Sequence, residues 1–261
     1  MRKAAPFVSD SSLDTPGIAK IKGARGDALV QAYKQAHGPV TLLGFSRGKD
    51  SVATALALRD RIEIVPFTYV IVDGLSFVEE SLAYFEKHLF GRRIARFPDG
   101  GVYHWLDIGA YQPVRNWEVY FASGLGDPVA GTNGMANYGN IVRRELMADE
   151  GIKTNALIAL GVQASDSPQR WLSFQRHGPI RGKQGAWYPI WNYARDRLLG
   201  EIERAGIKLP IDYHLFGKSF DGINYQYLVP LKRERPDDYR KIIERFPLAE
   251  VEVWKYERWS K

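Results

Sequence analysis

The segment Gly44–Ser51, GFSRGKDS, contains residue types that bind anions. Ser46 and Ser51 carry hydroxyl donors, and Lys49 carries a full positive charge. Gly48 lets the backbone approach a ligand closely. Such a segment can surround phosphate oxygens with donors and positive charge, so phosphate binding is the chemistry that it predicts. The alternative is an ordinary strand-to-helix turn that happens to contain the same residues.

The elements predicted on either side would position this loop. Residues 40–43, VTLL, are apolar or β-branched and are typical of a buried strand. Residues 52–58 have apolar side chains at helical spacing. The first N–H groups of a helix lack intrahelical acceptors, and the helix dipole adds partial positive charge there, so an anion is favoured at that end. The spacing matches neither the Walker motif GxxxxGK[ST] nor the dinucleotide fingerprint GxGxxG.

Composition limits the class of protein. The chain has 261 residues, of which 45% are hydrophobic, enough for a sizeable core. Its net charge of +6 fits an anionic ligand such as a nucleotide, free phosphate or nucleic acid. No apolar run approaches the roughly 18 residues of a membrane span, and residues 1–17 lack the apolar stretch of a secretory signal. We therefore expect a cytoplasmic protein without a membrane partner.

Cysteine is absent from the sequence. This excludes disulfides, cysteine-ligated iron–sulfur clusters and a thiol nucleophile within the chain. The five histidines show no HxH or HExxH spacing, so a zinc site is not predicted.

Strands and helices alternate after the loop. Residues 62–72 predict a second buried strand, with Pro66 interrupting its start. An amphipathic helix follows, for which Ser76 is the predicted N-cap and Glu79 completes a capping box. Residues 93–97 predict a third strand. This rhythm indicates parallel βαβ units, and the predicted fold is α/β with a doubly wound, mostly parallel sheet.

The domain organisation follows from these elements. Residues 1–22 predict an arm, 23–206 a nucleotide-binding α/β domain, and 207–261 a mixed helical extension packed on it. Residues 98–140 are rich in Gly and aromatic residues and have no clear period; a loop of this length is either functional or contains an element that the pattern does not indicate. The alternating tail, residues 250–259, is interpreted as an edge strand.

The motif FSRGKDS resembles SGGKDS, the PP-loop of ATP pyrophosphatases and of phosphoadenosine phosphosulfate (PAPS) reductases, in the adenine nucleotide alpha hydrolase-like superfamily. The matching positions are Ser46, Gly48, Lys49, Asp50 and Ser51. Arg47 replaces the first glycine of the motif, which either alters the loop or adds a phosphate contact.

Weaker matches to the PAPS reductase family follow in the expected order, over roughly residues 38–250. VIVDGLSFVEES matches a strand that ends in an aspartate, here Asp73, and Gly161-Val162-Gln163 matches the G(I/V)R segment with Gln163 in place of arginine. YPIWNYARD and YHLFGKSFDG match later motifs. Reductases of this family use a C-terminal cysteine, so the resemblance implies that the fold and nucleotide site are kept and the thiol chemistry is not.

The resemblance implies ATP and Mg²⁺ as ligands and adenylation of a substrate with release of pyrophosphate. The implied catalytic residues are Lys49, Ser46 and Arg170. The implied nucleotide-binding residues are Gly44, Phe45, Ser46, Arg47, Gly48, Lys49, Asp50, Ser51, Asp73, Gly161, Val162 and Gln163. Asp50 and Asp73 are candidate Mg²⁺ ligands, although Asp50 could instead cap the helix and Arg170 could form a surface ion pair.

Two other functions stay open. The protein could bind PAPS or another sulfonucleotide and rely on a thiol from a partner protein, or it could be a non-catalytic nucleotide-binding module. Short members of the family often come from phages or mobile elements, so a nucleobase or nucleic acid is a candidate substrate. Assembly into a homo-oligomer also stays open.

Two further features bear on substrate binding. Residues 176–183, RHGPIRGK, predict a basic loop that either closes over an anionic substrate or is simply solvated. Five tryptophans could stack on bases or pack in the core, namely Trp105, Trp117, Trp171, Trp187 and Trp191.

Overall fold

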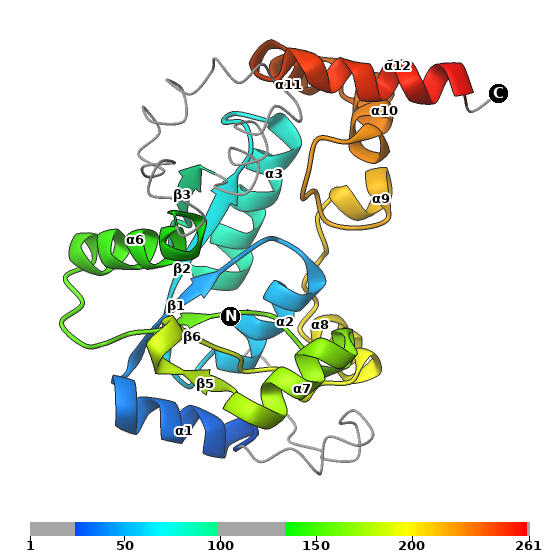
Figure 1. Cartoon of the computed structure of the whole chain (residues 1–261). Helices are drawn as coiled ribbons and strands as arrows, with labels where there is room; N and C mark the ends of the chain where they lie inside the picture. The colour runs from blue at the N-terminus through cyan, green and yellow to red at the C-terminus, as the bar shows by residue number, and fades with distance from the viewer. Residues whose placement is uncertain (1–23, 99–133, 260–261) are drawn as a thin grey trace. The chain divides into compact units, whose positions relative to one another are not determined.

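A computed structural model describes residues 24–98 and 134–259 of the chain (Figure 1). The described residues form two compact units. The first consists of residues 24–68, 84–95 and 143–209, and the second of residues 69–83, 96–98, 134–142 and 210–259. The predicted arm over residues 1–22 lies outside the described residues, as does most of the segment 98–140.

The sheet has six strands in the order β3-β2-β1-β4-β6-β5. Their bounds are Val40–Gly44 (β1), Glu63–Val70 (β2), Ala95–Pro98 (β3), Ile158–Ala159 (β4), Ile180–Arg181 (β5) and Ala186–Trp187 (β6). Strand β1 runs parallel to β2 and to β4, β4 runs parallel to β6, and only β5 is antiparallel to its neighbour. The predicted α/β class with a mostly parallel sheet is confirmed.

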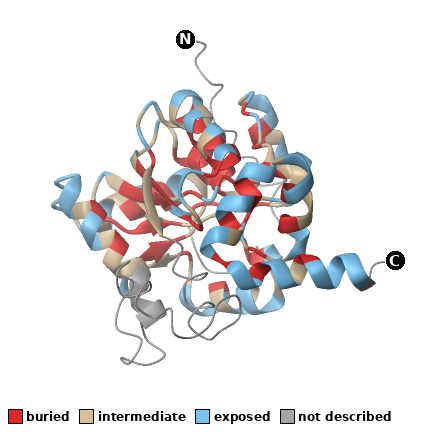
Figure 2. Ribbon diagram, turned by 90° about the horizontal axis from the view of Figure 1, so that it is seen from above, coloured by how far each residue is buried: buried red, intermediate tan, exposed pale blue. Residues whose placement is uncertain are grey.

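The helices of the first unit surround strands that are largely buried (Figure 2). They are α1 (Gly26–His37), α2 (Lys49–Leu58), the π-helical turn η3 (Glu86–Phe90), the C-terminal half of α6 (Gly134–Asp149), η6 (Ala164–Asp166), α7 (Pro168–His177), η7 (Gly182–Gln184) and α8 (Arg195–Arg204). Helix α2 is buried on every side from Ser51 to Leu58 because it packs between β1 and α8. Its Ala- and Leu-rich sequence suits this position, since a helix that is apolar all round belongs in a core.

A buried polar network holds the central strands in register. The Tyr33 hydroxyl, on α1, donates to the Val40 carbonyl at 3.1 Å and accepts from the Leu157 amide at 2.8 Å. Trp187 stacks on Tyr33 with ring centroids 4.0 Å apart, and its Nε1 donates to Thr41 Oγ1 at 2.8 Å. Burial raises the pKa of Tyr33, so this phenol stays neutral. The network therefore joins β1, the residue before β4, and β6.

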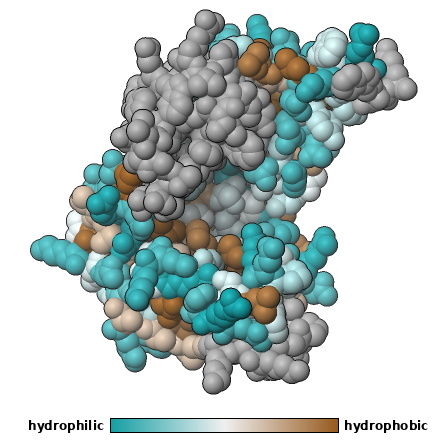
Figure 3. All heavy atoms as spheres, viewed as in Figure 1, coloured by the Kyte–Doolittle hydropathy of each residue, from teal (hydrophilic) through white to brown (hydrophobic). Residues whose placement is uncertain are grey.

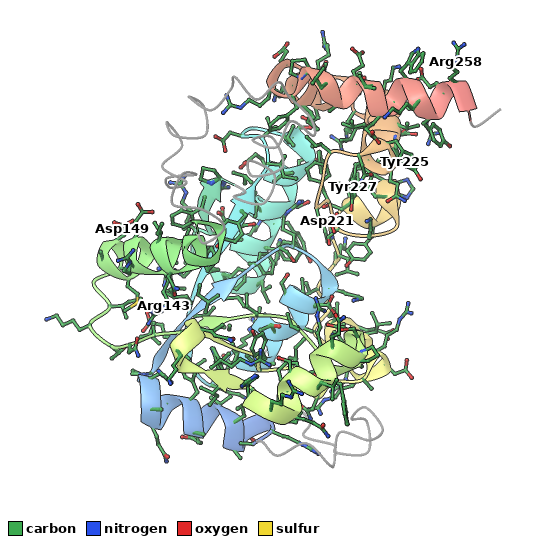
Figure 4. All side chains as sticks on the ribbon, in the orientation of Figure 1. Arg143, Asp149, Asp221, Tyr225, Tyr227 and Arg258 are labelled. Carbon is green, nitrogen blue, oxygen red and sulfur yellow. The ribbon has the colours of Figure 1, made fainter. Side chains whose placement is uncertain are left out.

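Arg143 fixes the chain just before β4. Its Nε donates to the Ala156 carbonyl at 2.5 Å, and its Nη2 donates to the Asn155 side chain (Figure 4). These bonds come from the C-terminal half of α6. They fix the residues just before β4, and the segment that follows β4, residues 160–166, is part of the candidate site.

The second unit is mainly helical. It contains α3 (Ser76–Phe85) up to residue 83, α9 (Asp212–Phe216), α10 (Tyr225–Glu234), α11 (Pro236–Arg245), η8 (Pro247–Ala249) and α12 (Glu250–Trp259). Its core includes an aromatic cluster in which Phe77 lies edge-on to Phe216 and Phe220. Tyr227 joins this cluster, and its hydroxyl donates to the Asp221 carboxylate (Figure 4).

The interpretation of the tail as an edge strand is wrong, because residues 250–259 form α12. A strand would place Val251 and Val253 on the same face. In the structure Val253 is buried with Ala249, four residues earlier, whereas Val251 is 42% exposed. The period of the buried residues is therefore that of a helix, and α12 packs on α10 and η8.

The predicted capping box at Ser76 is also wrong. Ser76 is the first residue of α3, and the cap comes from Asp238 on α11, whose carboxylate accepts from the Ser76 amide at 2.7 Å and from the Phe77 amide at 3.4 Å. Glu79 forms an ion pair with Arg96 instead. A carboxylate from far along the chain thus replaces the local cap.

Pro66 does not interrupt β2, which runs through it in register with β1. The Glu63 amide donates to the Pro39 carbonyl, and the Phe67 carbonyl accepts from the Phe45 amide, so these odd-numbered residues bond toward β1. Pro66 has the opposite parity. Its nitrogen faces away from β1, so no hydrogen bond to β1 is lost.

The predicted basic loop over residues 176–183 is structured. Arg176 and His177 are the last turn of α7, and the chain continues through β5 into η7. Ser167 caps α7 by accepting from the Arg170 amide, and Pro168 occupies the first helical position. Within the described residues, no helix is long and apolar enough to span a membrane.

Candidate functional site

The loop after β1 lies where the strand order reverses. Strands β1 and β4 are parallel neighbours. The earlier strands β2 and β3 lie on the outer side of β1, and the later strands β6 and β5 lie on the outer side of β4. Open α/β sheets bind ligands beyond the carboxyl ends of their strands at such a reversal. Two segments leave the sheet at this point, residues 44–51 after β1 and residues 160–166 after β4, and both belong to the first unit.

The backbone of the loop adopts a conformation that usually requires glycine. Arg47 has φ of 66° and is 5% exposed, and it stands at the position of the first glycine in the PP-loop motif. A left-handed conformation costs a residue with a Cβ about 1–2 kcal/mol. Gly48 follows as the N-cap of α2, with φ of −70° and ψ of 160°. Because the strained conformation persists at Arg47, the surrounding fold must impose the turn.

The first turn of α2 carries an ion pair linked to the segment after β4. Lys49 Nζ lies 2.8 Å from both oxygens of the Asp50 carboxylate, and Gln163 Nε2 donates to Asp50 Oδ1 at 2.9 Å. Both charged side chains are about one-third exposed, whereas Gln163 is buried. The Lys49 ammonium thus lies at the surface of the loop, accessible to an anion.

Two serine hydroxyls complete the loop. Ser51 Oγ donates to the Gly48 carbonyl at 2.9 Å, and Ser46 Oγ donates to Ser51 Oγ at 3.3 Å. Ser46 is exposed and Ser51 is buried. The N-cap of α2 is Gly48, which has no side chain that could accept from the first amides of the helix, and this helix end favours negative charge.

A close backbone contact joins the two segments. A Cβ added to Gly161 would lie 2.7 Å from the Asp50 carbonyl carbon and 2.8 Å from its oxygen, both backbone atoms. At Gly44, a Cβ would meet the Leu160 side chain at 3.1 Å. Glycine at position 161 is therefore needed for the segment after β4 to lie against the first turn of α2.

Asp166 connects this site to α7, and the site residues predicted from the sequence do not include it. Its carboxylate accepts a hydrogen bond from the backbone N–H of Gln163 at 2.9 Å and lies 2.5 Å from Arg170 Nη1. The Asp-x-x-x-Arg spacing beside a Ser-Pro helix start could have indicated this pair. A surface ion pair is the alternative role that the sequence leaves open for Arg170, and Arg170 does form one, with Asp166. The Arg170 side chain is still half exposed.

The remaining predicted residues take different places. Phe45 is a core residue whose ring lies edge-on to Phe85 and Phe90, so only its backbone faces the loop. Val162 is partly exposed between Gly161 and Gln163. Asp73 belongs to the second unit, where it is exposed in the turn after β2. Its role as a ligand stays a prediction.

The tryptophans proposed for stacking divide into two groups. Trp187 and Trp191 are fully buried and belong to the core, whereas Trp171 on α7 is partly exposed. Trp105 and Trp117 lie outside the described residues. Stacking by Trp187 or Trp191 would require the core to open.

The described residues contain no group of three or more His, Cys, Asp or Glu side chains that could hold a metal ion. Asp50 is the carboxylate of the loop, and both of its oxygens already accept hydrogen bonds from Lys49 or Gln163. This arrangement favours an orienting role for Asp50 over a role as a Mg²⁺ ligand. A Mg²⁺ ion that enters on nucleotide phosphates would not need a preformed cage of protein ligands.

Comparison with protein-family models gave no match to this chain, and no curated protein sequence matched it.

Proposed function

We propose that this protein is a PP-loop enzyme related to the PAPS reductase and ATP pyrophosphatase families, which binds ATP and adenylates a substrate with release of pyrophosphate. The observation that carries the proposal is the backbone at Arg47. Arg47 has a Cβ and yet adopts the left-handed conformation that glycine adopts most readily, and Gly48 follows at the N-cap of α2. This turn supports the proposal because it presents the N-terminus of α2 and the Lys49 ammonium on the same short loop.

The proposed reaction places negative charge where the loop has donors. A substrate oxygen attacks the α-phosphorus of ATP, the bond to the bridging α–β oxygen breaks, and pyrophosphate leaves with its electron pair. Lys49 and the exposed Ser46 hydroxyl would stabilise the leaving pyrophosphate, because positioned donors act most strongly where charge develops. Mg²⁺ would enter with the nucleotide and neutralise phosphate charge.

The segment after β4 would hold this arrangement in place. Gln163 fixes the Asp50 carboxylate, and Asp50 fixes the Lys49 ammonium, so the cation is oriented before ATP arrives. Orienting a charged group in advance removes a reorganisation cost at the reaction step. Lys49 is thus the residue proposed to contact phosphate, and Gln163 and Asp50 are positioning residues.

The test is the identity of the products formed from ATP. The full chain is incubated with ATP labelled at the α-phosphate and Mg²⁺, with water as the acceptor, and nucleotides are separated by thin-layer chromatography. We expect slow formation of AMP that falls by about tenfold or more in Lys49→Ala and not in Lys153→Ala, an exposed lysine of the same unit.

Three outcomes would contradict the proposal. Formation of ADP would mean cleavage at the γ-phosphate, and equal AMP formation by both variants would remove Lys49 from the reaction. ATP binding without any turnover would leave a nucleotide-binding module that acts through a partner.

A further inference from the structure

Most of the chain's net positive charge lies in one stretch beside the site. Residues 168–195 contain five Lys or Arg residues and no Asp or Glu, whereas the whole chain has a net charge of +6. The basic residues are Arg170, Arg176, Arg181, Lys183 and Arg195. The stretch forms α7, β5, η7 and β6 and ends at the first residue of α8. It begins two residues after Asp166, which contacts Gln163 of the candidate site.

Helix α7 gathers its basic side chains on one side. Arg170, Ser173 and His177 follow one another at steps of three and four residues, and Gln169 and Arg176 lie beside them at a spacing of seven. We call these five residues the basic face. Hydrophilic side chains gather over α7 in Figure 3. Arg170 and Arg176 are separated by about 9 Å along the helix axis, at 1.5 Å per residue.

Arg181 extends the basic face from β5 and is held in a fixed position. Its guanidinium carbon lies 4.9 Å from the Phe174 ring centroid and 4.8 Å from that of Tyr188, and its Nε donates to the Gly178 carbonyl at 3.2 Å. Phe174 belongs to α7, so Arg181 lies beside that helix. A guanidinium oriented in this way retains donors for a phosphate and loses little entropy on binding.

Few carboxylates compensate this charge. Arg170 forms an ion pair with Asp166, but neither Arg176 nor Lys183 is paired with an acidic side chain of the described residues, and both are exposed. Leu172, the exposed large apolar residue of α7, lies one turn before Arg176, at the edge of the basic face. A surface with several cations and a single exposed large apolar side chain suits a polyanion better than a lipid surface, which an amphipathic helix enters with a whole apolar face.

We propose that the basic face, together with Arg181 and Lys183, binds the phosphodiester backbone of a nucleic acid. This nucleic acid would be the acceptor of the proposed adenylation, so the inference rests on that function. The basic face begins at Arg170, whose partner Asp166 contacts Gln163, and runs away from the candidate site along α7. Phosphates bound along α7 would keep a nucleotide of the same strand near the loop.

The test measures binding by fluorescence anisotropy with labelled single-stranded DNA, single-stranded RNA and duplex DNA of one sequence, each about 20 nucleotides or base pairs long, which exceeds the site size of most single-strand-binding modules. The variant is Arg176→Glu/Lys183→Glu. The matched control is Lys153→Glu/Lys208→Glu, which changes the charge equally at two other exposed lysines of the first unit. ATP binding by the wild-type protein is measured in parallel.

We expect the wild-type protein to bind at least one of these nucleic acids with an affinity that falls steeply with salt. The Arg176→Glu/Lys183→Glu variant should bind about 20-fold more weakly at about 0.1 M salt, because each single-strand phosphate contact contributes a salt slope of about 0.7. Its salt slope should be smaller by between 1 and 2, and the control variant should bind within about twofold of wild type.

The inference is overturned if no nucleic acid binds, if both double variants weaken binding equally, or if phosphatidylserine vesicles bind and the nucleic acids do not. If any of these results is obtained while ATP still binds normally, only the nucleic-acid inference fails and the proposed adenylation is not contradicted. If nucleic-acid binding behaves as predicted and ATP does not bind, the adenylation proposal fails and the binding surface stands.

Discussion

The Gln163 side chain donates a hydrogen bond to Asp50 Oδ1 at 2.9 Å across 113 residues of sequence. This bond joins the first turn of α2 to the segment after β4, at the point where the strand order reverses. Lys49 contacts the same carboxylate. The position of the lysine proposed to bind phosphate therefore depends on a residue from another strand of the sheet.

Replacing Gln163 with glutamate should replace the hydrogen bond between Gln163 and Asp50 with repulsion between two carboxylates. Gln163→Glu would place two carboxylates within hydrogen-bonding distance, so one of them would take up a proton more readily. We expect ATP affinity to fall by about tenfold or more at neutral pH and to recover toward about pH 5, where one carboxyl is protonated. Calorimetric titration with Mg-ATP at several pH values measures this.

Gln175→Glu is the control, because it makes the same substitution at an exposed position of α7. Equal losses in both variants, or a loss in Gln163→Glu that does not depend on pH, would show that the Gln163–Asp50 bond does not position Lys49.

Gly161 should not tolerate even one additional carbon. The Cβ of Gly161→Ala would lie 2.7 Å from the Asp50 carbonyl carbon, so the backbone of one segment must move. We expect a loss of about 1–3 kcal/mol in the free energy of unfolding by urea. Gly200→Ala in α8 has nothing within 4 Å of the added Cβ and should gain up to about 1 kcal/mol. Similar stabilities for the two variants would contradict the close contact.

The strain at Arg47 can be separated from the role of its side chain. Arg47→Ala and Arg47→Gly both remove the guanidinium, but only glycine adopts φ of 66° without steric cost. We expect Arg47→Gly to be more stable than Arg47→Ala by about 1 kcal/mol in urea denaturation. At an ordinary position alanine is the better residue, so an alanine variant that is equally or more stable would contradict the left-handed turn.

The sequence predicts the parts of this molecule that depend on neighbouring residues. The buried strand before the loop, the loop itself and the helix after it follow from residues 40–58, and the structure has all three. Helix α11 follows from Pro236 at its first position and acidic residues in its first turn. These patterns are local, so the sequence alone contains them.

Contacts between distant segments could not be predicted in this way. The Gln163–Asp50 bond spans 113 residues, and the cap of α3 comes from Asp238, which is 162 residues from Ser76. The alternation of apolar and charged residues in the tail, residues 250–254, favours a strand. Packing shows instead that Val253 is buried and Val251 is exposed, as in a helix. In each case the tertiary structure decides among options that the local sequence leaves open.

The cap provided by Asp238 should be a main source of stability in the second unit. Asp238 is 1% exposed and also accepts from the Ser76 hydroxyl at 2.6 Å. We expect Asp238→Ala to lower the free energy of unfolding by about 1–3 kcal/mol, because it leaves buried donors without an acceptor. Asp237→Ala removes a neighbouring carboxylate that is 79% exposed and should change stability by less than about 0.5 kcal/mol.

For Asp238, urea denaturation followed by circular dichroism measures both variants. If Asp238→Ala were as stable as Asp237→Ala, water could replace the carboxylate at the start of α3, and the cap would have no structural role.

The most direct measurement of the central claim is calorimetric titration of the full chain with ATP plus Mg²⁺ and, separately, with adenosine 3′,5′-bisphosphate, repeated on Lys49→Ala and on Lys153→Ala. We predict that ATP binds, and that its affinity falls by about 10- to 100-fold in Lys49→Ala only, since a charged hydrogen bond contributes about 1.5–3 kcal/mol. A preference for the bisphosphate would contradict the ATP assignment and indicate a sulfonucleotide site. Failure to bind either ligand would contradict the nucleotide-binding role of the loop.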